Sequence, residues 1–252
     1  MHRPRLVPVL LHGERGLVKT RQFMDPIYVG DPVNVLRIFN EKAADEMVLI
    51  DILATVEKRG PNLRMIADCA AECFVPLCYG GGVSTLKHAR DVLNCGVEKV
   101  VVNTASKHRG FVKGLAEEIG SQSVCAGIDF RRRSGHLVVV TRRGEDVCSG
   151  SLEEHVCAAA AAGAGEIILQ DVDRDGMGTG YDLEVIRRIC ALVDIPVMIL
   201  GGIGSLADAA AALHAGADAV GVGSMVTLYG PHRAVLVSYP QDHEVVALAK
   251  AR

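Results

Sequence analysis

Long apolar runs, long basic runs and closely paired cysteines are all missing from this sequence of 252 residues. No apolar stretch approaches the roughly 20 residues that a membrane-spanning helix needs, so we expect no membrane segment. The basic clusters at residues 131–133 and 142–143 are short and the formal net charge is −3, which argues against a nucleic-acid partner. The eight cysteines include no Cys-x-x-Cys pair. The sequence therefore predicts neither a metal site nor any other cofactor.

The first residues, Met1-His2-Arg3-Pro4, are polar and lack the apolar core of a secretion signal. An even number of cysteines without such a signal does not imply disulfides. We therefore expect a cytoplasmic protein with reduced thiols. The stretch from Asp171 to Asp182 partly matches a calcium-binding loop, but Asp182 stands where that loop has a glutamate.

Apolar residues make up 49% of the chain and charged residues 23%, so a sizeable core is possible. Eight strand-like apolar runs recur, at residues 6–11, 47–52, 75–79, 100–102, 124–128, 167–169, 197–200 and 219–222. Helical patterns lie between most of them, at residues 32–42, 62–73, 85–94, 152–162, 183–192 and 206–215. This alternation predicts an α/β fold, a single (β/α)₈ TIM barrel over residues 1–252.

The chain also repeats itself. A segment that begins at Val75 and another that begins at Ile195 align without a gap, at an offset of 120 residues. At the same offset Glu46 matches Glu166 and Asp51 matches Asp171. A period of this length predicts two duplicated half-barrels, approximately residues 1–120 and 121–240. An open doubly wound sheet is the alternative, but the internal symmetry favours closure.

Each half carries a glycine-rich turn directly after a strand and before a helix. Glycine lets the backbone approach an anion closely, and the helix that follows presents free N–H groups. The next strand in each half ends in small polar residues. The predicted phosphate-binding residues are Gly81, Gly82, Asn103 and Thr104 in the first half and Gly201, Gly202, Gly223 and Ser224 in the second. One such turn could be a plain tight turn, but two at related positions predict a doubly phosphorylated substrate.

Acidic residues stand at predicted strand ends, where side chains of a barrel face the active site. Asp51, Asp129 and Asp171 end strands, and Asp175 and Gly176 follow in a loop. We predict that Asp129 is catalytic and that the others belong to the substrate site. The alternative is that these carboxylates cap the following helix or brace a loop.

Lys19 lies in a long segment, residues 12–31, that follows the first strand. Loops in this place often fold over substrate as lids. We predict a second catalytic role for Lys19, the alternative being an ordinary solvated lysine.

Seven motifs resemble the cyclase subunit of imidazole glycerol phosphate synthase, and the resemblance covers roughly residues 3–228. They are PVLLHGERGLVKT, DILATVEKR, CYGGGV, VVVNTAS, GIDFRRR, DVDRDGMGTGYD and GGIGS. The resemblance implies a lyase-type synthase of histidine biosynthesis that uses ammonia from a separate glutaminase subunit. The substrate that the resemblance implies is a doubly phosphorylated ribulosyl-formimino aminoimidazole carboxamide nucleotide. The enzyme would convert it into imidazole glycerol phosphate and an aminoimidazole carboxamide ribotide.

Arg5, Glu46, Lys99 and Glu166 each stand just before a strand, which places them at the N-terminal mouth of the predicted barrel. By themselves they could be ordinary solvated strand starts. The resemblance implies that they form a salt-bridged ring that gates ammonia. It also implies a glutaminase docked on this face as a heterodimer, with Glu98 near the interface.

One position departs from the family. Its first strand ends in an aspartate that works with the fifth-strand acid, here Asp129, but Leu11 occupies that place. Losing a general acid or base typically costs about 10²–10⁴-fold in rate. Leu11 and a tail at residues 232–240 favour a paralogous subgroup that adds nitrogen to a nucleotide-activated sugar in surface-polysaccharide synthesis. An authentic histidine-pathway cyclase is the alternative. An aldose–ketose isomerase and a non-catalytic glutaminase activator are weaker ones.

Overall fold

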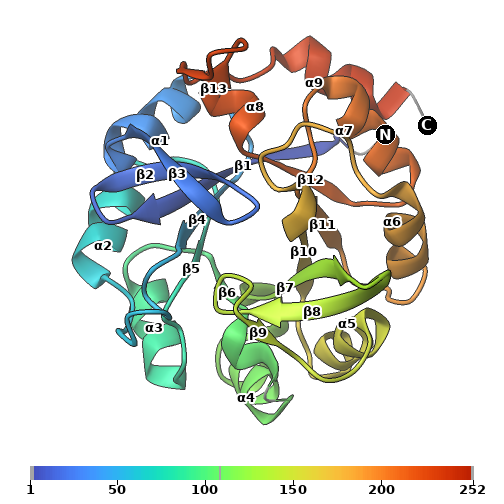
Figure 1. The fold of residues 1–252 in the computed structure, drawn as a ribbon. Helices are drawn as coiled ribbons and strands as arrows, with labels where there is room; N and C mark the ends of the chain where they lie inside the picture. The colour runs from blue at the N-terminus through green and yellow to red at the C-terminus, as the bar shows by residue number, and fades with distance from the viewer. Residues whose placement is uncertain (1–2, 108, 251–252) are drawn as a thin grey trace.

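Eight parallel strands close into a barrel in the structure, a computed structural model that describes residues 3–107 and 109–250 (Figure 1). They are β1 (Arg5–Gly13), β4 (Met47–Asp51), β5 (Leu77–Gly80), β6 (Lys99–Val102), β7 (Val124–Arg133), β10 (Glu166–Asp171), β11 (Val197–Leu200) and β12 (Ala219–Val222). Neighbouring strands pair in chain order, and β12 returns to pair with β1, with Arg5 opposite Ala219. The predicted (β/α)₈ barrel and its eight strand positions are thereby confirmed.

Helices surround the barrel on its outer side. They are α1 (Pro32–Glu41), α2 (Leu63–Ala71), α3 (Leu86–Asn94), α4 (Arg109–Ile119), α5 (Leu152–Ala161), α6 (Leu183–Cys190), α7 (Leu206–His214), the short α8 (Ser224–Thr227) and α9 (Asp242–Lys250). Side-chain caps define where several begin: Ser151 and Ser205 each form a capping box with the acid three residues later. Within residues 3–107 and 109–250 we find no helix with the length and apolarity to cross a bilayer.

The prediction of a loop over residues 12–31 is wrong, because most of this segment forms a hairpin. Strand β2 (Gly16–Arg21) pairs antiparallel with the end of β1, and β3 (Met24–Gly30) pairs with β2. A second hairpin extends β7 through β8 (His136–Thr141) and β9 (Asp146–Val147). Both hairpins lie over the C-terminal ends of the barrel strands, facing the viewer in Figure 1. A short third hairpin joins β13 (Leu228–Tyr229) to β14 (Ala234–Val235).

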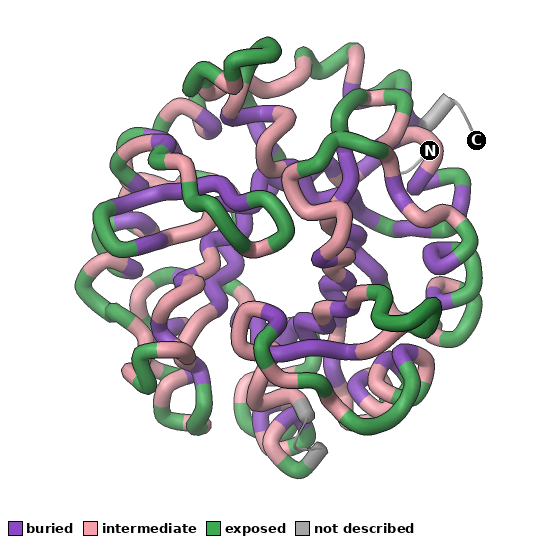
Figure 2. Tube along the Cα trace, viewed as in Figure 1, coloured by how far each residue is buried: buried purple, intermediate pink, exposed green. Residues whose placement is uncertain are grey.

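Side chains of the strands alternate between two cores. The larger core lies between barrel and helices, and Figure 2 shows burial concentrated in the strands and on the inner sides of the helices. The smaller core fills the barrel lumen with Val7, Val9, Val48, Cys78, Val101, Cys125, Ile168, Met198 and Ala219. Because successive side chains of a strand point to opposite faces, the lumen is lined by every second residue. This lumen separates the two mouths of the barrel.

A prediction follows from the contact between the C-terminal segment and β1. The Tyr239 hydroxyl donates a hydrogen bond to the Leu6 carbonyl oxygen at 2.6 Å, and its ring meets Phe39 edge-on. We expect Tyr239→Phe to lower the free energy of unfolding by about 0.5–1.5 kcal/mol, because one hydrogen bond is lost while the ring contact stays. Urea unfolding of both proteins measures this, and an unchanged midpoint and slope would contradict it.

Candidate active site and charged ring

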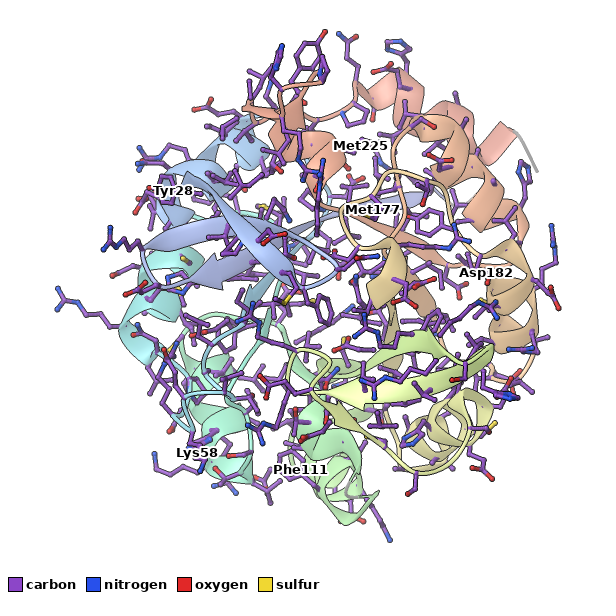
Figure 3. The ribbon with its side chains drawn as sticks, in the orientation of Figure 1. Tyr28, Lys58, Phe111, Met177, Asp182 and Met225 are labelled. Atoms are coloured by element: carbon purple, nitrogen blue, oxygen red, sulfur yellow. The ribbon has the colours of Figure 1, made fainter. Side chains whose placement is uncertain are left out.

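A cavity of about 700 Å³ opens at the C-terminal ends of the barrel strands. Its floor is apolar and consists of Val9, Leu11, Ile50, Val101, Ile168 and Leu200. Its walls carry polar groups from the ends of β4, β6, β7 and β10, among them Asp51, Asn103, Asp129 and Gln170. Lys58 and Phe111, which also line it, are labelled in Figure 3. The cavity therefore combines an apolar base with a polar rim, as small-molecule sites commonly do.

Asp129 ends the inward-facing row of β7 and lines this cavity. Although its carboxyl group is partly open to the cavity, it lies deep in the barrel, and burial raises its pKa to about 7. A hydrogen bond from Asn103 opposes this increase, while the charge of Asp175 adds to it. A carboxyl group with a pKa near neutrality can both accept and donate a proton at physiological pH.

Leu11 lines the same cavity from β1, where it pairs with Ile50 of β4. Its side chain belongs to the apolar packing at the upper end of the lumen. The site thus has a carboxyl group from β7, while β1 contributes a leucine at this level.

The first glycine turn faces the cavity. Gly81 and Gly82 have φ angles of 119° and 71°, which favour glycine. A Cβ atom on Gly82 would lie 2.7 Å from the Arg59 carbonyl oxygen, so a side chain there would displace the loop that follows β4. Asn103 and Thr104, from the end of β6, line the cavity beside this turn. The structure therefore brings the four predicted first-half phosphate residues together.

Asp51 serves mainly as a loop brace. Its Oδ1 accepts hydrogen bonds from the backbone N–H groups of Leu53 and Ala54, both at 3.0 Å. Its two oxygens also bind the Arg59 guanidinium at 2.7 and 3.0 Å. Of the two roles weighed from the sequence, these contacts favour bracing, and they fix Arg59 at the cavity wall.

Sequence reasoning missed the basic residues of this cavity, which are Lys58, Arg59, His88, Arg142 and Arg143. His88 Nδ1 lies 3.1 Å from the Gly82 carbonyl oxygen, so the imidazole adjoins the glycine turn. Two consecutive basic residues soon after a strand-ending acid, Lys58 and Arg59, were the available signal. The pair at 142–143 was set aside as a short cluster, yet its hairpin brings it to the cavity.

The four predicted second-half phosphate residues are not among the described residues that line this cavity. Gly201 and Gly202 have positive φ angles like the first turn, but the Gly202 carbonyl oxygen accepts a hydrogen bond from Gly180 N–H at 2.8 Å. The loop after β10 thus holds this turn. Gly223 and Ser224 follow β12, and Gly223 adjoins the Lys19 ammonium group.

The loop after β10 is braced by its own acids. Asp171 accepts a hydrogen bond from Asp173 N–H at 3.1 Å, and Asp175 accepts one from the Thr20 hydroxyl at 2.8 Å. The carbonyl oxygen of Gly176 accepts a hydrogen bond from Arg233 Nη1 at 3.1 Å. The buried Nε and Nη2 atoms of Arg233 have no hydrogen-bond partner among the residues described. Arg233 is a further basic residue that sequence reasoning missed.

Lys19 is buried in β2, with only 4% of its surface exposed. Its ammonium group donates to the Val9 carbonyl oxygen. Burial lowers the pKa of Lys19 to about 8, and the Asp175 carboxylate opposes this decrease. The alternative of a solvated lysine is thereby excluded, whereas a role in catalysis stays a prediction.

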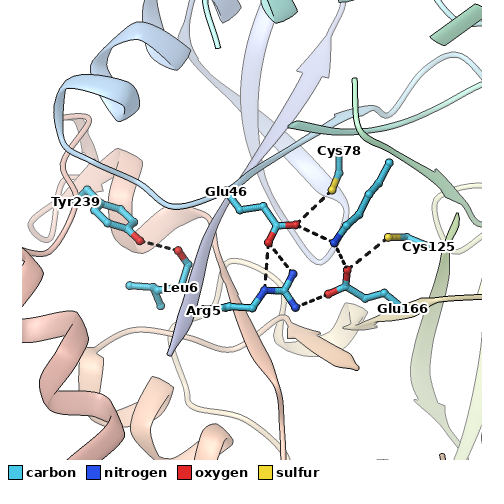
Figure 4. A network of polar contacts seen from close by, with 8 residues as sticks. Arg5, Leu6, Glu46, Cys78, Cys125, Glu166 and Tyr239 are labelled. Carbon is cyan, nitrogen blue, oxygen red and sulfur yellow. Dashed lines mark hydrogen bonds and ion pairs between the residues drawn. The ribbon is translucent and has the colours of Figure 1, made fainter. Parts of the chain in front are cut away.

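A closed ring of charges lies at the opposite, N-terminal mouth (Figure 4). Arg5 binds Glu46 at 2.6 Å and Glu166 at 2.8 Å, and Lys99 binds Glu166 at 2.7 Å and Glu46 at 3.4 Å. Burial alone would raise the pKa of Glu166, but the hydrogen bonds and charges of Arg5 and Lys99 outweigh it and lower that pKa. The four residues are therefore not solvated strand starts. Glu98 is exposed on the same side of the molecule, immediately before β6.

A polar cavity at the C-terminal ends of the strands is where (β/α)₈-barrel enzymes hold their active sites. The model of the histidine biosynthesis protein family matches residues 5–230, and the chain belongs to that family.

Relatives are similar over nearly the whole chain. One from Pseudomonas aeruginosa, named "Putative imidazole glycerol phosphate synthase subunit hisF2", is 45% identical over 97% of this chain and 99% of its own length. Another from Leptospira borgpetersenii, named "Putative imidazole glycerol phosphate synthase subunit HisF", is 43% identical over 98% of this chain and 99% of its own length. The "Imidazole glycerol phosphate synthase subunit HisF" of Alkaliphilus metalliredigens is 37% identical over 85% and 86%.

The raised pKa of Asp129 predicts a pH-dependent stability penalty. In the unfolded chain an aspartate ionises near its ordinary pKa of about 3.9, whereas the folded carboxyl group ionises only near 7. The free energy of unfolding therefore falls as the pH rises from about 3.9 to about 7, and this loss persists at higher pH. Asp129→Asn removes the titration, so its stability relative to wild type should be greater at roughly pH 8 than at roughly pH 4.

Urea unfolding at both pH values provides this measurement. Asp68→Asn, at an exposed position on α2, is the matched control. An equal stability difference between Asp129→Asn and wild type at the two pH values would show that the carboxyl group is not perturbed.

Proposed function

We propose that this chain is the ammonia-using synthase subunit of a two-chain glutamine amidotransferase. The observation that carries the proposal is the arrangement of a salt-bridged ring at one mouth, Asp129 at the other and an apolar lumen between them. The relatives from Pseudomonas aeruginosa and Alkaliphilus metalliredigens are named as synthase subunits, which supports an enzyme that works with a second chain.

The path through the barrel is short. On β6 the ring residue Lys99 and the cavity residue Val101 are successive inward-facing positions, and on β10 the same holds for Glu166 and Ile168. Two residues of a strand span about 7 Å. Neutral ammonia can cross such an apolar layer, whereas an ammonium ion would lose its hydration at a large cost. Ammonia admitted at the ring would thus reach the cavity floor directly.

Asp129 would manage the proton of the reaction. Ammonia that attacks an electrophilic carbon must lose a proton, and a carboxylate with a pKa of about 7 accepts it and can return it to a departing group. Lys19, whose buried ammonium group also has a lowered pKa, would hold or polarise the substrate from the β2–β3 hairpin. The basic residues that line the cavity and the first glycine turn would bind phosphate.

The N-terminal face is suited to a glutaminase partner. Phe74, in the turn before β5, is 81% exposed, and Leu192, before β11, is 43% exposed. Both precede strands, so they lie at the mouth that holds the ring, where Glu98 adds a negative charge. Exposed large apolar side chains beside a functional mouth support a protein docked there.

For the substrate, the cavity favours a nucleotide-activated sugar of surface-polysaccharide synthesis. Only the first-half glycine turn contributes to the cavity formed by the described residues, and Arg59 and His88 stand beside it. A single concentrated anion site fits two adjacent phosphates. Leu11 supports the same conclusion, because the histidine-pathway cyclase is expected to need an acid at this level of β1.

The second candidate is the authentic histidine-pathway cyclase, whose substrate has two separated phosphates. Arg233 favours it, because an incompletely bonded guanidinium beside Gly176 would attract an anion in the second half. This cyclase would require the loop after β10 to release the second glycine turn.

Asp129→Asn should lower ammonia-dependent turnover by about 10²–10⁴-fold while substrate still binds. The physical reason is that an amide can neither accept nor return the proton. Product formation with ammonium chloride and substrate binding by calorimetry are the two measurements, and Asp68→Asn is the control. Full turnover in Asp129→Asn would remove its assigned role.

The two substrates are distinguished by offering each, with ammonium chloride, to the wild type and to Leu11→Asp. We expect the wild type to be nearly inactive with the histidine-pathway nucleotide and Leu11→Asp to gain about 10²-fold or more, because a second acid is restored. Turnover of that nucleotide by the wild type at an ordinary enzymatic rate would refute the sugar proposal and establish the cyclase.

Phe74→Asp should weaken the association with a glutaminase subunit at least about tenfold, because an apolar anchor is replaced by a charge. The probe is the glutaminase subunit of imidazole glycerol phosphate synthase, and calorimetry gives the dissociation constant. Tyr28→Asp, on the hairpin at the opposite mouth and 55% exposed, is the control. Equal affinities for Phe74→Asp and wild type would place the partner elsewhere.

A further inference from the structure

Two thiol groups lie directly inside the charged ring, and both are buried (Figure 4). Cys78 on β5 directs its Sγ to Glu46 Oε1 at 3.4 Å, and Cys125 on β7 directs its Sγ to Glu166 Oε2 at 3.6 Å. Each acidic residue of the ring therefore has a thiol hydrogen-bond donor behind it, on the lumen side.

The thiols contact the same two oxygens that Lys99 binds. The Lys99 ammonium group lies 3.4 Å from Glu46 Oε1 and 2.7 Å from Glu166 Oε2. Arg5 binds the other oxygen of each carboxylate, Glu46 Oε2 and Glu166 Oε1. One oxygen of each carboxylate is thus held by arginine, and the other is shared between Lys99 and a thiol.

Opening the ring requires a cation to leave, and Lys99 is the one held more weakly. It has a single ammonium group, and one of its two contacts is 3.4 Å long. Arg5 holds both carboxylates through separate nitrogens at 2.6 and 2.8 Å. If Lys99 left with nothing else present, two buried carboxylate oxygens would lose their donors, which is strongly unfavourable.

We propose that Cys78 and Cys125 are positioning residues of the ring, whose S–H groups keep Glu46 Oε1 and Glu166 Oε2 hydrogen-bonded when Lys99 moves away. The reason for the ring to open, the passage of ammonia, rests on the function proposed above. The contacts between the two thiols and the ring carboxylates do not depend on that function.

A thiol suits this role because it is a weak, neutral donor. It does not compete with the Lys99 ammonium group while the ring is closed. The neighbouring Cys125 thiol and burial raise the pKa of Cys78, so Cys78 keeps its proton at neutral pH. A valine or alanine could fill this space but could not donate.

The test is a double-mutant cycle on the full chain by urea unfolding at neutral pH. Lys99→Met removes the ammonium group and so imitates the open ring. In this background, Cys78→Ala with Cys125→Ala should raise the unfolding equilibrium constant about fivefold more than the same pair does in the wild type. Replacing both cysteines by serine, which keeps a donor, should abolish that excess.

The control is Cys69→Ala, a buried thiol on α2 whose polar contact is Met65 Sδ. Its effect should be the same with and without Lys99. Equal effects of the alanine pair in both backgrounds, or an excess that serine does not abolish, would overturn the proposal. If the alanine pair does not fold, Cys125→Ala and Cys125→Ser are compared alone in the same two backgrounds, with the same criteria.

This cycle contains no glutaminase, ammonia or substrate. Additive effects would therefore refute the role of the thiols whether or not the chain uses ammonia. Conversely, a failure of ammonia-dependent turnover would refute the proposed function while leaving a measured coupling between Lys99 and the thiols intact.

Discussion

The parallel pairing of β12 with β1 is the constraint on which the remaining structure depends, because it closes the sheet. Closure directs every second side chain of the eight strands into one lumen, where these side chains lie in layers. The charged ring, the thiols, the apolar floor and the cavity are successive levels of that lumen. Arg5 and Glu166 are remote in the chain and meet only because their strands share one cylinder.

Burial acts to raise carboxyl pKa values at both ends of this lumen, but the net shifts are opposite. At the N-terminal end two cations offset it, so the pKa of Glu166 falls and the ring stays charged and closed. At the C-terminal end burial raises the pKa of Asp129 to about 7, and the charge of another acid, Asp175, adds to this increase. One environment favours fixed ion pairs and the other favours proton exchange.

The duplicated sequence does not produce two equivalent sites. Both glycine turns have positive φ angles, yet only the first faces the cavity. The second is bonded to Gly180 of the loop after β10, whose acids hold that loop in place. A repeated local pattern thus sets the backbone of the turn, whereas the neighbouring loop decides what the turn faces. In the function proposed above, this asymmetry supports a substrate with adjacent phosphates.

The amino-acid sequence alone determined the strands, most of the helices, the barrel and the mouth at which the ring residues lie, because local periodicity and strand order specify these. Periodicity did not reveal the β2–β3 hairpin, since the burial of Lys19 and Thr20 depends on pairing with β1. Only the tertiary structure decided that Arg59 and His88 reach the cavity and that Cys78 and Cys125 contact the ring. Such contacts join residues far apart in the chain, and their geometry exists only after the sheet has closed.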